Sequence, residues 1–216
     1  EKTFKKTRQK TMVLDNITLS NLNVVGKDNS LFIKMDFCCT QFGKRLLMEF
    51  LCAPTSEVDE IRGRQDAVNE LFLNSELLQN CRRLLGSLNV DLERSLAQIH
   101  QFGNKEAMKD HPSSRAILYE TQTYAKNKIT DFAAALNAFD ALMEVPVMFA
   151  GCRSKLLKNL TQTSENGGSF IDMSQEIAKN KNSFNIKEAL KLGYAIPEKN
   201  ADPEYDAILE EIEELE

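Results

Sequence analysis

Residues 40–54 read TQFGKRLLMEFLCAP, the pattern of one amphipathic helix between a start signal and a stop signal. Thr40 is a residue type that caps helix starts, and Pro54 is one that ends helices. The apolar residues between them recur three and four positions apart and share one face: Phe42, Leu46, Leu47, Phe50 and Leu51. Because this spacing recurs along most of the chain and strict alternation is rare, the sequence predicts an all-α protein. Residues 17–25 are the one weak strand candidate.

Three further short helices are expected before residue 104. The first would begin within the pattern Ser56-x-x-Asp59, and Gly63 would weaken it by about 1 kcal/mol relative to Ala. Asp91 can cap the third. Their apolar stripes are Val58, Ile61, Val68, Leu71 and Phe72; Leu77, Leu78, Cys81, Leu84, Leu85 and Leu88; and Leu92, Leu96, Ile99 and Phe102. Short amphipathic helices hide such stripes only by packing on one another, so we expect a helical core.

The longest expected helix follows Pro112. Ser113 or Ser114 can cap it, and it would continue to about Glu144 and stop before Pro146, a length of roughly 45 Å at 1.5 Å per residue. Its apolar residues repeat at three and four positions: Ile129, Phe132, Leu136, Phe139 and Met143. Such a seam is typical of a helix that lies along another helix, so we expect a lever-shaped element.

The remainder of the chain is expected to alternate helix and loop. Residues 153–160 are expected to be helical, and residues 161–169 and 180–185 are expected to be loops. From Pro203 onward an acidic helix carries a narrow apolar stripe: Tyr205, Ile208, Ile212 and Leu215. Because this stripe stops without a cap and the chain starts at Glu1 rather than Met, we expect the natural protein to be longer.

Composition limits the classes of function. The chain has 216 residues, of which 42% are hydrophobic, enough for a real core, and its net charge is −5. It lacks the roughly 18 uninterrupted apolar residues of a membrane span. An acidic chain gains little from counterion release on DNA, so we expect weak nucleic-acid binding, and we interpret the basic residues 1–10 as a solvated face or tail.

Signals for metal sites and catalysis are missing from the sequence. The five cysteines form no Cys-x-x-Cys pair and neither histidine has a cysteine at ligand spacing, so we expect reduced core thiols in an intracellular protein and no zinc site. The chain has no Glu-x-x-His pattern, no phosphate-binding Gly-rich loop and no nucleophile elbow. No catalytic, cofactor-binding or metal-binding residue is therefore expected.

One charged side chain lies in an unusual place. Arg64 falls on an otherwise apolar stripe, where a guanidinium needs carboxylate partners or a path to water. Asp66, Asp91 and Glu93 are the candidate partners. We interpret these residues, together with Arg94, as a packing and capping network that fixes how helices cross, in preference to a ligand site.

Several short motifs resemble the core, or lever, domain of the MutS-type DNA mismatch-repair ATPases. They are Leu14-Asp15 with Thr18 and Asn21-Leu22, then residues 40–54, Arg64-Gln65-Asp66-Ala67-Val68, and Asp91-Leu92-Glu93-Arg94. Residues 42–47 and 111–117 look most like the large eukaryotic subunit of that family. Gln41 stands where the family commonly has Pro, and Phe50 where it commonly has Trp. The family's mismatch-reading Phe-x-Glu element has no match in this chain.

The resemblance implies a non-catalytic lever that couples an ATPase domain to a DNA clamp. Residues 1–200 would form the helical core and lever domain, and residues 201–216 would begin the helix that leads toward the clamp. The parent would be a nuclear, DNA-dependent ATPase that uses ATP and magnesium, although no cofactor is expected in this fragment. It would pair with a MutS homologue 2-type subunit and bind mismatched duplex DNA mostly through other domains, without a membrane.

An alternative reading of the seams stays open. The chain could be a free-standing helical protein-protein interaction module, in which residues 129–143 and 205–215 bind partner helices. A metal-dependent helical enzyme is disfavoured because its ligand patterns are missing. The mass of the chain in solution separates the first two readings, since a coiled-coil adapter should dimerise and a clipped lever should be mostly monomeric.

Overall fold

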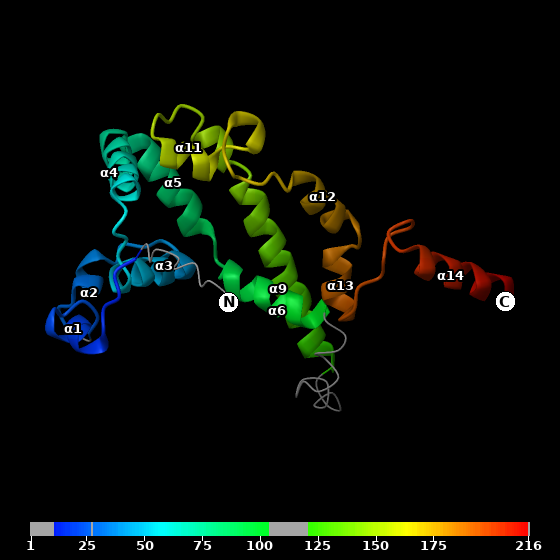
Figure 1. Cartoon of the computed structure of the whole chain (residues 1–216). Helices are drawn as coiled ribbons and strands as arrows, with labels where there is room; N and C mark the ends of the chain where they lie inside the picture. The colour runs from blue at the N-terminus through cyan, green and yellow to red at the C-terminus, as the bar shows by residue number, and fades with distance from the viewer. Residues whose placement is uncertain (1–10, 27, 104–120, 216) are drawn as a thin grey trace, which may run out of the picture. The chain divides into compact units, whose positions relative to one another are not determined.

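The computed structural model of the chain describes the backbone of residues 11–26, 28–103 and 121–215 (Figure 1). Within these residues the regular structure is helical, and the only strand-like pairings are isolated bridges such as the one between Thr163 and Phe170. The all-α prediction is therefore confirmed. No helix in this described part is long and apolar enough to cross a membrane.

The chain divides into two compact units, each of which is discontinuous in sequence. The first unit consists of Glu1–Ser87 and Val145–Phe170, and the second of Leu88–Glu144 and Ile171–Glu216. The boundary expected between residues 200 and 201 stays a prediction, although a new helix, α14 (Pro203–Leu215), begins close to it.

The first unit contains seven α-helices and a short 3-10 helix among its described residues. These are α1 (Asn16–Asn21), α2 (Leu31–Met35), α3 (Gln41–Cys52), α4 (Val58–Leu73), α5 (Ser75–Ser87), α10 (Val145–Met148), α11 (Lys155–Thr161) and η1 (Ser164–Asn166). As expected, Thr40 caps α3, because its Oγ1 accepts a hydrogen bond from the Gly43 N–H at 3.2 Å, and the helix ends before Pro54.

The strand expected in residues 17–25 is wrong, because α1 occupies most of that segment. The Asp15 carboxylate accepts a hydrogen bond from the Thr18 N–H at 2.7 Å and so caps a helix start. The side-chain and backbone hydrogen bonds with Thr18 hold the Asp15 pKa below its usual value. A single local cap thus outweighs the β-branched composition of this stretch.

Helix α4 differs from its expected form in two ways. It begins at Val58, after Glu57, so Ser56 is not its cap. The apolar stripe expected in the core is also largely exposed: Val68 is 67% exposed and Phe72 is 78% exposed. We call Val58, Ile61, Gln65, Val68 and Phe72 the outer face of α4; all five are exposed. The buried side of the helix instead carries Ala67, with Leu71 packed against the core.

The core of the first unit joins segments that are far apart in sequence. Its buried residues are Ala67, Leu77, Phe149, Cys152 and Leu157, and the residues packed against them are Leu71, Cys81, Val145, Met148 and Leu156. Helix α11 therefore packs on α4, and α10 packs on α5. This core therefore includes Val145–Phe170, the segment of the first unit that follows the second unit's first segment in sequence.

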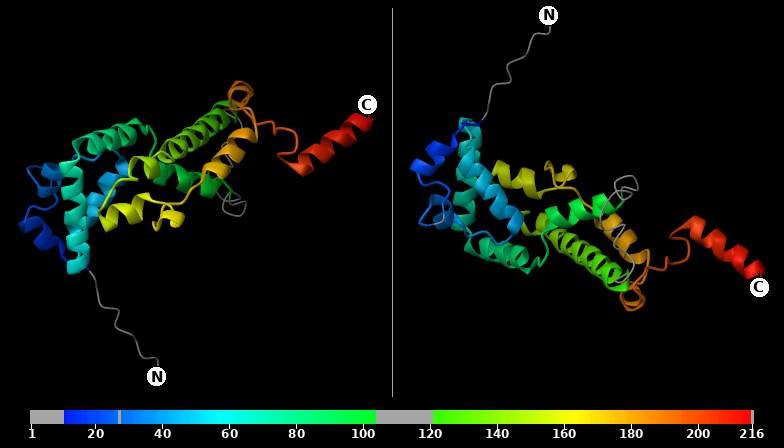
Figure 2. Two further views of the ribbon diagram at one scale, coloured as in Figure 1. Left: turned by 90° about the horizontal axis from the view of Figure 1, so that it is seen from above. Right: turned by 90° about the horizontal axis from the view of Figure 1, so that it is seen from below.

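In the second unit, α9 (Thr121–Leu142) is the central element. It packs against α6 (Leu92–Gly103), α12 (Ser174–Asn182) and α13 (Ile186–Leu192), as Figures 1 and 2 show. The expected start of the long helix near residues 113–114 lies outside the described residues. The helix ends at Leu142, two residues earlier than expected, because the N–H of Met143 bonds to the carbonyl of Asp140 in a tighter turn.

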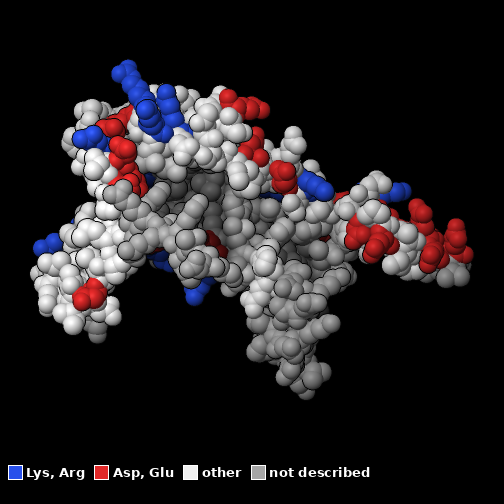
Figure 3. Space-filling model, viewed as in Figure 1, with Lys and Arg blue, Asp and Glu red and all other residues white. Residues whose placement is uncertain are grey.

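The remaining expectations for the second half are mostly confirmed. Helix α11 lies close to the expected 153–160 range and ends at Thr161, one residue into the loop expected at 161–169, whose remaining residues contain the short helix η1. The interruption expected over residues 180–185 is shorter, because α12 continues to Asn182. The expected acidic helix is α14, and Figure 3 shows Asp and Glu side chains gathered over it.

Candidate functional site

A carboxylate on α4 fastens α11 to the first unit. The Glu70 oxygens accept hydrogen bonds from the backbone N–H groups of Arg153 and Ser154, each at 2.6 Å. Ser154 in turn caps α11, because its hydroxyl oxygen accepts from the Leu157 N–H at 3.5 Å. Free N–H groups at a helix start attract a carboxylate, so Glu70 fixes where α11 begins. The partners lie 83 and 84 residues away and use backbone atoms, so no local sequence signal could have revealed this contact.

The segment around α11 is tied together by its own backbone. Gln162 is buried, and its Nε2 donates to the Pro146 carbonyl at 2.9 Å, which links the end of α11 to α10. The Gln162 carbonyl accepts from the Phe170 N–H at 2.9 Å. A Cβ at Gly168 would lie only 1.9 Å from that same carbonyl oxygen, so only glycine fits here. Residues 145–170 are therefore one fastened piece.

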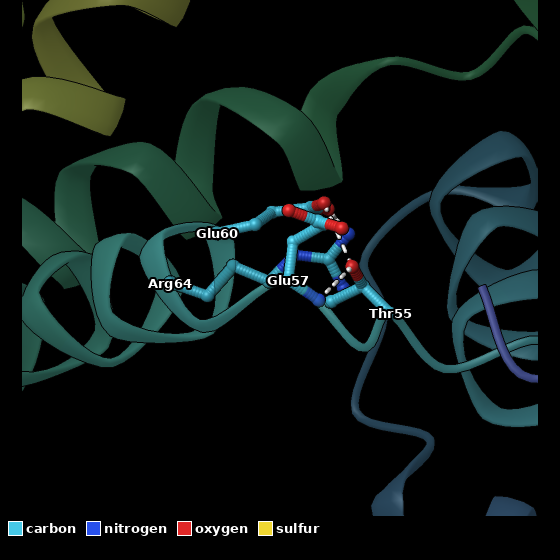
Figure 4. A network of polar contacts seen from close by, with 4 residues as sticks. All are labelled: Thr55, Glu57, Glu60 and Arg64. Carbon is cyan, nitrogen blue, oxygen red and sulfur yellow. Dashed lines mark hydrogen bonds and ion pairs between the residues drawn. The ribbon is translucent and has the colours of Figure 1, made fainter. Parts of the chain in front are cut away.

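Arg64 takes part in a polar network between α4 and the segment that precedes it (Figure 4). One of its terminal nitrogens lies 2.5 Å from Glu60 Oε1, one helical turn away. The other Glu60 oxygen accepts from the Thr55 hydroxyl at 2.9 Å, and Thr55 Oγ1 accepts from the Glu57 N–H at 3.3 Å. The guanidinium also lies 3.8 Å from the centre of the Phe50 ring, a cation–π contact that joins α4 to α3.

The partner of Arg64 differs from those considered in the sequence. Glu60, at i−4, is a partner that the helical spacing could have indicated. Asp66 is exposed on α4. Asp91 accepts a hydrogen bond from the Arg94 N–H at 3.5 Å at the start of α6, where Glu93 occupies the first turn. Asp91, Glu93 and Arg94 belong to the second unit, so a network that includes them with Arg64 stays a prediction.

Helix α9 is enclosed by its own unit on one face. Ala135 is 2% exposed, and Leu136 and Ala138 are also buried. The Phe132 ring stacks on Phe184 with centroids 6.2 Å apart, and Lys181 Nζ lies 2.7 Å from Asp140 Oδ2. The other seam residues, Ile129, Phe139 and Met143, are half-buried, and Met143 lies beyond the end of the helix. The face is thus covered by elements of this chain.

The cysteines are not all core residues, which corrects the expectation from sequence. Cys38 and Cys39 are exposed, Cys52 and Cys81 are half-buried, and only Cys152 is buried. All five are free thiols. Burial is the largest cause that raises the pKa of Cys81 and of Cys152, so these two are held in the poorly reactive thiol form.

Within the described residues, no group of three or more His, Cys, Asp or Glu side chains is arranged to hold a metal ion. The charged groups described above instead fasten helices to one another. The described geometry is that of a long helix, α9, enclosed by its own unit, and of a core in which α4, α10 and α11 are fastened to one another.

Comparison with known proteins places this geometry in context. Residues 17–214 match the family model of MutS domain III. The chain is 47% identical over 210 residues to a probable DNA mismatch repair protein Msh6 of Drosophila melanogaster, and 36% identical over 217 residues to DNA mismatch repair protein Msh6 of Homo sapiens. It is 30% identical over 216 residues to DNA mismatch repair protein MutS of Methanosarcina mazei.

The aligned segments cover most of this chain but little of these relatives. They cover 97%, 95% and 85% of the chain, respectively, and 18%, 16% and 23% of the relatives. The chain thus corresponds to one domain-sized segment of each relative.

Proposed function

We propose that this chain, which belongs to the MutS family of DNA mismatch-repair proteins and is most like Msh6, is the lever of a larger mismatch-recognition protein. In this role it performs no chemistry. It couples an ATPase domain to a DNA clamp, because nucleotide bound at one end and DNA bound at the other both shift the conformation of the same rigid element. Allostery of this kind is a coupling free energy between the two binding sites.

The observation that carries the proposal is the continuity of α9 with the fastened core. Helix α9 has 22 residues, about 33 Å at 1.5 Å per residue, and its apolar face is enclosed by α6, α12 and α13. Only Met143 and Glu144 separate it from α10, which is tied to α11 through Gln162. Because this connection is so short, a movement of α9 is expected to move α10 as well.

The remaining parts of the machine lie outside this chain. We propose that the parent is a nuclear protein that hydrolyses ATP with magnesium in a separate domain, so the chain itself needs no cofactor. It pairs with a MutS homologue 2-type subunit and contacts mismatched DNA mostly through other domains. The support is the mismatch-repair name of the relatives and the small share of their length that this chain matches.

The test is a kink in α9 within the full-length parent. Ala135→Pro removes a helix hydrogen bond and costs about 3 kcal/mol. We expect mismatch binding without nucleotide to stay within a few fold of wild type, and ATP-triggered release from mismatched DNA to slow at least tenfold. Asn137→Ala, at an exposed site, and Leu136→Ala, which opens a cavity without a kink, are the matched controls. Wild-type release kinetics in folded Ala135→Pro would show that α9 does not carry the coupling.

A milder variant covers the case in which Ala135→Pro does not fold. Ala135→Gly keeps the backbone N–H and weakens the helix by about 1 kcal/mol. We expect it to slow ATP-triggered release less than Ala135→Pro but measurably, with mismatch binding unchanged.

A second candidate function is a helical interaction module, favoured by α14. Ile208 and Ile212 are exposed on this acidic helix, an apolar stripe that a partner helix could cover. Mass measured in solution discriminates the two functions, because a homodimeric adapter doubles its mass and a lever domain stays monomeric.

A further inference from the structure

The loop that follows α11 contains the only Asn-Gly dipeptide of the sequence, Asn166-Gly167. The side-chain amide of an asparagine is open to attack by the backbone nitrogen of the next residue, because that attack closes a five-membered ring. Glycine in the next position places no Cβ beside the attacking nitrogen and gives the backbone the freedom to reach the ring geometry. Asn166 is also exposed to solvent. The pair therefore has the chemistry needed for spontaneous deamidation.

The turn around this pair restrains both reacting groups. Asn166 ends the 3-10 helix η1, and the Gly167 N–H donates to the Ser164 carbonyl at 3.1 Å. Gly167 has a φ of 78°, a left-handed conformation that suits glycine. The Asn166 side chain is held as well, since its Nδ2 donates to Thr163 Oγ1 at 3.5 Å. The attack therefore requires that the turn open first, and an exposed turn opens locally at much lower cost than the whole unit unfolds.

The same turn is tied to the end of α11. The Gly168 N–H donates to the Thr163 carbonyl at 2.9 Å, and the Phe170 N–H donates to the Gln162 carbonyl at 2.9 Å. The backbone at Gly168 has little room to move, because even a Cβ there would lie 1.9 Å from the Gln162 carbonyl oxygen. A change in backbone length at position 166 would therefore disturb the contacts that close this loop.

We propose that Asn166 is a site of spontaneous modification, at which opening of the η1 turn lets the Gly167 nitrogen attack Asn166 Cγ. The N–Cγ bond forms, the Cγ–Nδ2 bond breaks, and ammonia leaves with the proton of the Gly167 nitrogen. Water then opens the resulting succinimide ring at one of its two carbonyl groups and gives either aspartate or isoaspartate. Isoaspartate adds one carbon to the backbone between Thr163 and Gly168, so it loosens the loop from the end of α11.

Peptide mass spectrometry measures the conversion. The folded chain is incubated at physiological temperature and pH beside a synthetic peptide of residues 159–179, the same peptide that trypsin releases around Asn166. We expect Asn166 to convert in the folded chain, but about tenfold more slowly than in the peptide, because the turn is closed most of the time. Asn159, which is exposed and is followed by Leu160, is the internal control and is expected to stay unconverted.

Gly168→Ala tests whether the turn controls the reaction. The added Cβ does not fit beside the Gln162 carbonyl, so the turn should open, while the reacting pair Asn166-Gly167 is unchanged. We expect Asn166 in this variant to convert within about twofold of the rate in a peptide of the same sequence. If the variant does not fold, amide exchange of Gly167 in the wild-type chain replaces it. One opening frees this N–H for exchange and for attack, so the two reactions should be slowed by the same factor within about threefold.

The consequence for α11 is measured on the isoaspartate form, separated by chromatography. Its Phe170 N–H is expected to exchange at least tenfold faster than in the unmodified chain, and an unchanged rate would contradict the proposed loosening. The proposal is overturned if Asn166 stays intact in the folded chain while the peptide converts fully. It is also overturned if the folded chain and the peptide convert at equal rates, or if Gly168→Ala converts no faster than wild type. These readouts need neither ATP nor DNA, so they are independent of the coupling function.

Discussion

Helices α9 and α4 carry the same kind of apolar spacing and yet differ in what covers it. The stripe of α9 is enclosed by α6, α12 and α13 of its own unit, so Ala135 and Leu136 are buried. The stripe of α4 is the outer face, and it is exposed, while Ala67 and Glu70 on the other side make the contacts. Periodicity therefore predicts a helix, whereas the partner of that helix depends on the rest of the fold.

Within the proposed coupling function, the difference separates two expected roles. A helix whose apolar face is closed within its own unit can move with that unit as a rigid element. A helix with one closed face and one open face can connect its unit to another part of the protein. Four substitutions in the isolated chain, taken from the closed face to the open one, test this reading.

The largest effect is expected at the closed face of α9. Leu136→Ala should lower the free energy of unfolding by about 2–5 kcal/mol, because it leaves a cavity under the surrounding helices. Urea unfolding followed by circular dichroism measures it, and the neighbouring exposed substitution Asn137→Ala should stay within about 0.5 kcal/mol. A loss below 1 kcal/mol for Leu136→Ala would mean that the face is not enclosed.

The next effect is expected at the inner side of α4. Glu70→Ala leaves the N–H groups of Arg153 and Ser154 without their acceptor, so we expect a loss of about 1–3 kcal/mol. Glu70→Gln keeps one carbonyl oxygen and should recover part of that loss. Glu49→Ala, on the exposed surface of α3, is the matched control. If both glutamates give the same small change, the contact with α11 carries no stability.

A smaller effect is expected on the flank of α4, at Arg64. Arg64→Ala removes the contacts with Glu60 and Phe50 and should cost about 0.5–1 kcal/mol, since the side chain is a third exposed. Arg64→Lys keeps the charge but loses the planar stacking, so it should recover only part of the free energy of unfolding that Arg64→Ala loses. The part of the loss that comes from the ion pair with Glu60 should shrink in high salt. An unchanged urea midpoint of unfolding for Arg64→Ala would show that this network contributes no stability.

The smallest effect is expected at the outer face of α4. Phe72→Ala should change the unfolding free energy of the isolated chain by no more than about 0.5 kcal/mol, because the ring is 78% exposed. Thermal unfolding of the two chains side by side checks this. A loss above 2 kcal/mol would mean that the ring is buried in solution.

Much of this fold could be predicted from local sequence signals. The cap at Thr40 and the stop at Pro54 fix α3, and the acidic helix from Pro203 is likewise found where its pattern begins. The strand expected over residues 17–25 failed because one carboxylate, Asp15, decides a helix start through a contact that composition does not reveal. The family was also recognisable from its short motifs, and the match over residues 17–214 confirms it.

The candidate site was less accessible to sequence reasoning. Arg64 has a carboxylate partner, Glu60, which was missed although it lies one helical turn away. Glu70 and Gly168 could not be found, because each acts on backbone atoms brought close only by the fold. The exposure of Val68 could not be inferred either, since an apolar stripe carries no information on whether its partner lies within the same chain.

Amide hydrogen exchange of the isolated chain against the full-length parent tests the central claim most directly. Exchange reports how often each helix opens, and a docked face opens less often. The amides of α9 are expected to show the same protection in both proteins, because its face is closed within this chain. In the isolated chain the amides of α4, whose outer face is exposed, are expected to be less protected than those of α9. Equal protection of α4 and α9 in the isolated chain, or a tenfold gain across α9 in the parent, would contradict the division between a closed helix α9 and an open helix α4.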